Sequence, residues 1–216
     1  MRFAPALFNQ HLALKGQRFW WRRSALCPCR AQHSGGARTD CPVCGGAGWS
    51  WDRGRAAHAG VVGAKAARAY ADFGRWQDGD VMLSVPADSP LWRAGENDRV
   101  RMEQGEQPFQ RRFTRDGTER MTVRVVAIER CTWLSPDGEE LLDAAPPRVD
   151  PETGAVTWPA GADAPDPGAQ YSLRGMQRPE YFLFKDLPVT RAHFQGQALP
   201  KRMLLRVFDL FGRGQK

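Results

Sequence analysis

Short runs of alternating apolar and polar residues dominate the chain after about residue 76. The longest covers residues 119–134, where polar residues separate Met121, Val123 and Val125. A period of two is typical of a strand with one buried face. Further runs that resemble strands cover residues 80–85, 98–103, 107–115, 139–142, 170–174, 181–184 and 202–210. This pattern predicts a mainly β protein.

The turn signals between these runs indicate the fold class. Asp-Gly pairs at residues 116–117 and 137–138 are typical of hairpins. Helical segments do not alternate with the strands, so we expect a small β-barrel or sandwich of about six to eight strands over residues 76–216. Residues 144–170 hold six prolines and are expected to form a Pro/Gly-rich excursion with a short strand at 155–158. A linked series of hairpins is the alternative.

Residues 1–26 are expected to form a basic, aromatic N-terminal arm in front of the β domain. The arm begins with apolar residues, of which Phe8 and Leu12 could form a short helical face. It continues into the sequence Arg-Phe-Trp-Trp-Arg-Arg at residues 18–23. Since few arm contacts would be needed for the core of the β domain, we expect removal of residues 1–23 to leave that domain folded.

A connector is expected over residues 56–75. Its alanine-rich sequence permits a helix or a strand at residues 56–73. Gly60 and Gly63 weaken the helix prediction, because glycine is a poor helix former.

The positive charge of the chain is concentrated at its N-terminal end. The net charge is +7, and residues 1–60 hold nine Lys/Arg against two acidic residues, whereas the remaining 156 residues hold 22 of each kind. This asymmetry is typical of contact with a polyanion or an acidic partner surface. A solvated, disordered arm is the alternative, but this segment is richer in aromatic residues than such an arm. The residues predicted to contact a partner or nucleic acid are Arg18, Trp20, Trp21, Arg22 and Arg23.

No segment has the composition of a membrane span or a secretion signal. No run approaches the roughly 18 apolar residues needed to cross a bilayer. Residues 1–10 also lack the long apolar stretch and the cleavage site of a signal peptide. We therefore expect neither membrane association nor export.

Four of the five cysteines form two closely spaced pairs. Cys27 and Cys29 are one residue apart, Cys41 and Cys44 are two residues apart, and eleven residues separate the pairs. Two pairs of thiolates on tight turns can converge on one ion with the tetrahedral geometry that zinc prefers. The sequence therefore predicts a zinc-ribbon-like module over residues 27–55, in which these four cysteines bind a structural Zn²⁺.

The surroundings of the cysteines leave one alternative ligand. Gly45, Gly46 and Gly48 follow the second pair and let backbone amides turn toward the sulfurs. The first pair is less regular, so His33 is an alternative to one of its cysteines. Disulfides and a redox dithiol are weaker interpretations, because neither an export signal nor a strand-to-helix redox turn is present. If all four cysteines bind the ion, its coordination sphere has no open position for water or substrate, so we expect a structural and not a catalytic zinc.

Cys131 lies in a strand-like run and is expected to be a buried non-ligand.

The sequence carries no recognisable catalytic motif. The four histidines lack partners at metal or nucleophile spacing, and the nucleophile-elbow, phosphate-loop and H-E-x-x-H patterns do not occur. Acidic pairs such as Glu139 and Glu140 flank turns, where carboxylates are usually solvated. We therefore expect no enzyme activity and no catalytic residues.

Residues 41–48, Cys-Pro-Val-Cys-Gly-Gly-Ala-Gly, resemble one C-x-x-C-x-G-x-G repeat of the zinc domain of DnaJ-type chaperones. The match covers eight residues, whereas that family uses four such repeats. The resemblance implies shared zinc-knuckle chemistry.

A broader resemblance rests on the arginine-rich segment, the cysteine pairs and the turn-rich β region together. The segments that carry it are residues 27–49, 79–86, 178–182 and 199–213. In this combination the chain resembles virion structural proteins of tailed bacteriophages, in particular the small β proteins of the head-tail neck. The resemblance implies a head-completion or stopper subunit, a head-to-tail connector that forms a homo-oligomeric ring around the DNA channel.

The same resemblance implies partners and a location. The partners would be portal, adaptor or tail proteins and the enclosed DNA, with no membrane. The protein would belong to the virion, assembled in the host cytoplasm. Many small head-completion proteins lack a zinc module, so a tail or baseplate position is an alternative.

Two further hypotheses explain the basic segment. The first is a zinc-ribbon nucleic-acid-binding protein, in which Arg18, Arg22 and Arg23 contact phosphates and Trp20 or Trp21 stacks on bases. It explains the β domain less well, because that region shows no basic excess. The second is a chaperone or scaffold that holds clients through the zinc module.

Overall fold

The computed structural model describes residues 5–63, 77–159, 161, 163–187, 193–194 and 196–210. The chain divides into two compact units. The first, here called the barrel unit, combines residues 1–103 with residues 180–216. The second, the inserted unit, is residues 104–179. The predicted single β domain over residues 76–216 is therefore wrong, because strands that precede and follow residues 104–179 in the sequence build one unit, and those residues form the other.

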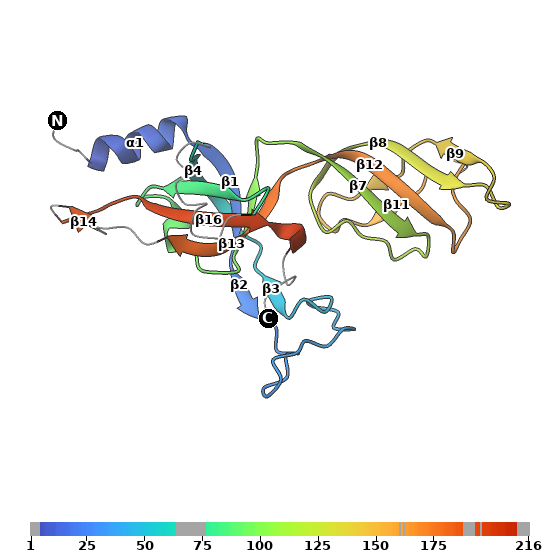
Figure 1. Cartoon of the computed structure of the whole chain (residues 1–216), viewed down its shortest axis with the longest axis horizontal. Coiled ribbons are helices and arrows are strands. Elements are labelled where there is room, and N and C mark those ends of the chain that lie inside the picture. The colour runs from blue at the N-terminus through green and yellow to red at the C-terminus, as the bar shows by residue number, and fades with distance from the viewer. Residues whose placement is uncertain are drawn as a thin grey trace. The chain divides into compact units, whose positions relative to one another are not determined.

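A closed antiparallel barrel forms the centre of the barrel unit, in the order β1-β4-β5-β16-β13-β6. Figure 1 labels four of these strands, β1, β4, β13 and β16. The barrel strands are β1 Gln17–Arg22, β4 Arg55–Val61, β5 Val81–Val85, β6 Arg99–Met102, β13 Glu180–Leu187 and β16 Lys201–Val207. Because the sheet closes on itself, these strands leave no unpaired edge. The predictions of a mainly β protein and of a small barrel are confirmed.

The strand β1 shows why the first residues belong to the barrel. Phe19 and Trp21 point inward and are 0% and 1% exposed, whereas Trp20 between them is half-buried. The strand pairs with β4 on one side and with β6 on the other. The prediction of a separate arm over residues 1–26 is therefore wrong, since the arginine-rich hexapeptide is a core strand.

The helix α1, Pro5–Lys15, precedes this strand. Its Leu12 is buried and lies so close to Gly60 of β4 that a Cβ there would stand 2.6 Å from the leucine side chain. Gly60 thus permits close contact between helix and strand. Residues 56–61 of the predicted connector belong to β4, and residues 64–75 of it lie outside the described residues.

The inserted unit has its own sheet and core. Its four strands, in the order β7-β12-β8-β9, are β7 Gln107–Thr114, β12 Gln170–Gln177, β8 Val125–Leu134 and β9 Leu141–Ala144. The hairpin β10 Arg148–Val149 and β11 Val156–Thr157 supplies Val156 to the buried cluster, so the Pro/Gly-rich segment is part of this unit. The long predicted strand begins at Val125, although Met121 and Val123 are buried.

Short elements complete the described chain. They are β2 Ser24–Leu26, β3 Trp49–Trp51, η1 Pro90–Arg93, β14 His193–Phe194, β15 Gln197–Ala198 and η2 Phe208–Leu210. Within the described part, no helix has both the length and the apolar composition to cross a bilayer.

Candidate metal centre

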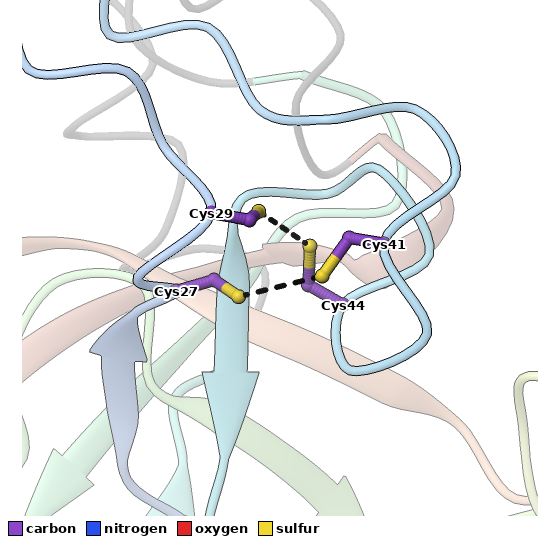
Figure 2. Close-up of side chains that lie close together, drawn as sticks. All are labelled: Cys27, Cys29, Cys41 and Cys44. Carbon is purple, nitrogen blue, oxygen red and sulfur yellow. Dashed lines mark hydrogen bonds between the residues drawn. The ribbon is translucent and has the colours of Figure 1, made fainter.

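A two-stranded hairpin brings the two cysteine pairs together. Strand β2 pairs with β3 in the antiparallel register Leu26 to Trp49. Cys27 and Cys29 follow β2 directly, and the turn with Cys41 and Cys44 precedes β3. Pairing of the strands therefore places both turns at the same end of the hairpin, as Figure 2 shows.

The four sulfurs have the spacing of ligands around one ion. Cys27 Sγ lies 3.8 Å from Cys41 Sγ, and Cys29 Sγ lies 3.5 Å from Cys44 Sγ. All four Sγ atoms lie within 4.8 Å of one another. Sulfurs at the corners of a tetrahedron around an ion at about 2.3 Å would be about 3.8 Å apart, whereas a disulfide needs about 2.05 Å. The cysteines are free and could bind one metal ion.

Glycines shape the turn that carries the second pair. Gly45, Gly46 and Gly48 all have positive φ, which a residue with a side chain rarely adopts. The backbone N–H of Gly48 donates to Cys44 Sγ at 3.3 Å, and its carbonyl accepts from Cys27 N–H at 2.9 Å. The glycine positions thus turn backbone donors toward sulfur and join the two turns.

The surroundings of the sulfurs shift the pKa values of two of the cysteines in opposite directions. Hydrogen bonds from the backbone N–H groups of Cys44 and Val43 lower the pKa of Cys41 to about 6. Burial, followed by hydrogen bonds with the neighbouring thiols, raises the pKa of Cys29 to about 12. Four thiolates at this spacing would repel one another, and a divalent cation at their centre would compensate their charge.

A buried carboxylate attaches the hairpin to the barrel. Asp98 accepts hydrogen bonds from Trp21 Nε1 at 2.8 Å and from the backbone N–H of Ser24 at 2.8 Å. It also accepts from Ser24 Oγ and from the backbone N–H of Gly95, both at 3.0 Å. Trp51 Nε1 donates to the carbonyl of Asn97 at 3.1 Å. The metal-binding turns therefore extend from a hairpin whose base is hydrogen-bonded to the barrel.

Other residues singled out from sequence lie elsewhere. His33 is exposed and is not a member of the cysteine group, which is the one candidate metal cluster among the described residues. Cys131 is 0% exposed on β8 of the inserted unit, and burial raises its pKa to about 11.

The residues predicted to contact a partner do not form one surface. Trp21 lies in the core and is therefore not available for stacking on a base. Trp20 Nε1 donates to the carbonyl of Arg53, and Arg22 Nε donates to the carbonyl of Asp52. Arg18 is exposed on the same strand. Arg23 is exposed and its guanidinium lies 5.1 Å from the centre of the Trp21 ring. Alternation along β1 separates these side chains between the two faces of the strand.

The hydrogen bonds of Asp98 and the close approach of α1 to β4 were not visible in the sequence pattern, because they join residues far apart along the chain.

No protein-family model matches the sequence, and a search of curated proteins finds no match.

Proposed function

We propose that the protein is a non-catalytic structural subunit of a tailed-phage virion, a head-completion or neck subunit that assembles as a ring around the DNA channel. The observation that carries this proposal is the opposite charge of the two units. The barrel unit holds 22 Lys/Arg against 12 Asp/Glu, a net +10, whereas the inserted unit holds 9 against 12, a net −3. The zero net charge of residues 61–216 is therefore the sum of a positive contribution from the barrel unit and a negative contribution from the inserted unit.

Opposite charges within one chain favour contacts between unlike units of neighbouring copies. Such a contact is heterologous, and a heterologous contact closes into a ring when its rotation is a whole fraction of a turn. The helix α1 adds apolar area, because Leu7 and Leu14 are 67% and 74% exposed and lie two turns apart on one face. This architecture supports the resemblance to neck proteins, in which ring formation is the function.

The ring is tested by the mass of the protein at two salt concentrations. We expect an assembly several times the 24.2 kDa of one chain in about 50 mM NaCl, and its dissociation toward monomers in about 500 mM NaCl, because salt screens the attraction. Light scattering after size-exclusion chromatography measures both. Co-assembly with portal and tail proteins, observed by electron microscopy, tests the location in the particle. A chain that stays monomeric at low salt and with these proteins contradicts the proposal.

Charge reversal on one unit provides a matched control. Glu139 and Glu140 are exposed in the inserted unit, and their replacement by Lys changes its charge from −3 to +1. We expect this variant to lose the assembly at low salt. Glu96 and Asp78 are exposed in the barrel unit, and the same double replacement there adds equal charge without reducing the attraction. Equal effects of the two variants would contradict the contact between unlike units.

We also propose that the metal of the cysteine centre is one structural Zn²⁺. Four soft thiolates select zinc, iron or copper(I), and the observed spacing fits a tetrahedral ion without an open position. The ion would hold a segment with few buried apolar residues, and its binding energy would contribute to folding of the segment.

Zinc content is expected to be about one equivalent per chain in protein purified without added metal. Elemental analysis by mass spectrometry measures it and separates zinc from iron and copper. The double variant Cys41→Ser with Cys44→Ser should lose the metal, whereas Cys131→Ser should retain it, because Cys131 is buried in the other unit. Less than about half an equivalent in the wild type, or retention in the double variant, would disprove the zinc site.

A further inference from the structure

A hollow of about 420 Å³ in the barrel unit is lined by three arginines. They come from separate segments: Arg23 lies between β1 and β2, Arg55 begins β4, and Arg93 ends η1. Trp21 and Trp92 also line the hollow. Its volume falls in the range of about 300–1,000 Å³ that is typical of ligand sites.

The three guanidinium groups have no carboxylate partner within the described part of the chain. The one acidic residue of the lining, Asp88, lies 3.6 Å from His58 Nε2 instead. The lining therefore carries an excess of positive charge.

A second arginine-lined hollow, of about 390 Å³ in the inserted unit, differs in this respect. Its Arg130 lies 2.6 Å from Asp143, and its Arg174 lies 3.8 Å from Glu129. These carboxylates compensate two of the four arginines that line this hollow, the other two being Arg111 and Arg112. Because the barrel unit carries a net charge of +10 and the inserted unit −3, the hollow of the barrel unit is the better anion site of the two.

Two of the three arginines that line the hollow, Arg23 and Arg55, lie over the ring of Trp21. The guanidinium carbons of Arg23 and Arg55 lie 5.1 and 5.2 Å from the centre of the Trp21 ring, so they are at most about 10 Å apart. Trp21 is itself fixed, because it is buried and donates to Asp98. Two like charges repel at this separation, and an anion bound between them would relieve the repulsion.

The geometry points to a site for the phosphodiester backbone of a nucleic-acid strand in this hollow. Guanidinium groups match phosphate oxygens with two parallel hydrogen bonds, and three of them suit adjacent phosphates of a polyanion. The half-buried Trp92 also lines the hollow; its ring packs against the barrel core, and Lys201 Nζ lies 5.3 Å from the ring centre. The +10 charge of the barrel unit attracts a polyanion toward the site. The site does not depend on the proposed ring.

Fluorescence anisotropy with labelled 20-nucleotide single strands and duplexes tests the site, over about 50–300 mM NaCl. The variant Arg23→Ala, Arg55→Ala and Arg93→Ala is expected to bind the single strand about 100-fold more weakly at low salt. The slope of log K against log salt should become shallower by about 2, since each lost phosphate contact contributes about 0.7. The matched control, Arg130→Ala with Arg174→Ala, should bind within about threefold of the wild type.

The three side chains are exposed, so the variant should keep the thermal unfolding temperature of the wild type. A second variant with Lys at the three positions keeps the charge and should retain most of the salt slope, which separates loss of contact from loss of fold.

Unchanged binding of the alanine variant would overturn the site. Equal affinity for poly-glutamate would assign it to an acidic protein, and displacement of the oligonucleotide by inorganic phosphate at equal phosphate concentration would assign it to a small phosphate ligand. Both results also overturn the proposal.

Discussion

Removal of residues 1–23 is expected to unfold the barrel unit. The deletion takes away β1, so β4 and β6 each lose a hydrogen-bonded neighbour. It also takes Phe19 and Trp21 out of the core, and loss of one such aromatic side chain usually costs about 3–5 kcal/mol. Two of them together approach the whole stability of a typical domain, about 5–15 kcal/mol. Thermal unfolding followed by near-ultraviolet circular dichroism should lose the transition of this unit.

A shorter deletion separates the strand from the helix in front of it. Removal of residues 1–16 takes away α1, whose buried contribution is Leu12, and leaves β1 in place. We expect this variant to keep a cooperative transition at a reduced temperature. The inserted unit has its own core, so both variants should retain its strand signal in the far ultraviolet. A folded barrel in the longer deletion would contradict the assignment of β1 to the core.

The arm was mispredicted because the partners of β1 are distant in sequence. The hexapeptide at residues 18–23 does alternate, with Phe19 and Trp21 inward. Its arginines and the basic composition around it nevertheless suggested an exposed arm. Only the pairing with β4 and with β6, more than 30 and more than 75 residues away, shows that the strand is internal. Local composition does not report such pairings.

The two-unit organisation was also beyond the sequence pattern. Strands of the same kind occur before residue 104, within residues 104–179 and after them, so periodicity does not mark where the chain leaves one core for another. The barrel includes the pairing of β6 with β13, and these two strands come directly before and directly after the inserted unit in the sequence. A contact of this kind depends on the whole fold.

Short-range signals were more informative. The Asp137-Gly138 pair joins β8 and β9, which are hydrogen-bonded neighbours, and Gly138 has the positive φ that this turn needs. The two cysteine pairs converge as their spacing predicts, because each pair occupies one tight turn. The arginine-lined hollow could not be predicted, since Arg23, Arg55 and Arg93 come together only when the barrel closes.

Replacement of Glu180 by Ala is expected to lower the free energy of unfolding of the barrel unit by about 3–5 kcal/mol. Glu180 is the first residue of β13 and accepts a hydrogen bond from Arg99 Nη2. The two side chains are 4% and 11% exposed, so the variant would remove a buried carboxylate that accepts from a buried guanidinium. Arg99 also lies over the ring of Phe208 at 3.9 Å and over that of Trp51 at 5.8 Å. Its displacement would therefore loosen the hairpin that carries the cysteines.

The same strand supplies a control for this prediction. Asp186 of β13 pairs with Lys201 Nζ at 2.9 Å but is 48% exposed, so Asp186→Ala should cost at most about 1 kcal/mol. Urea unfolding followed by tryptophan fluorescence compares the two variants. The double replacement Arg99→Met with Glu180→Leu should recover much of the stability lost in Glu180→Ala, because it removes the buried charge as well as its partner. If the double variant is instead as unstable as Glu180→Ala, the loss comes from packing of these side chains and the ion pair is not its cause.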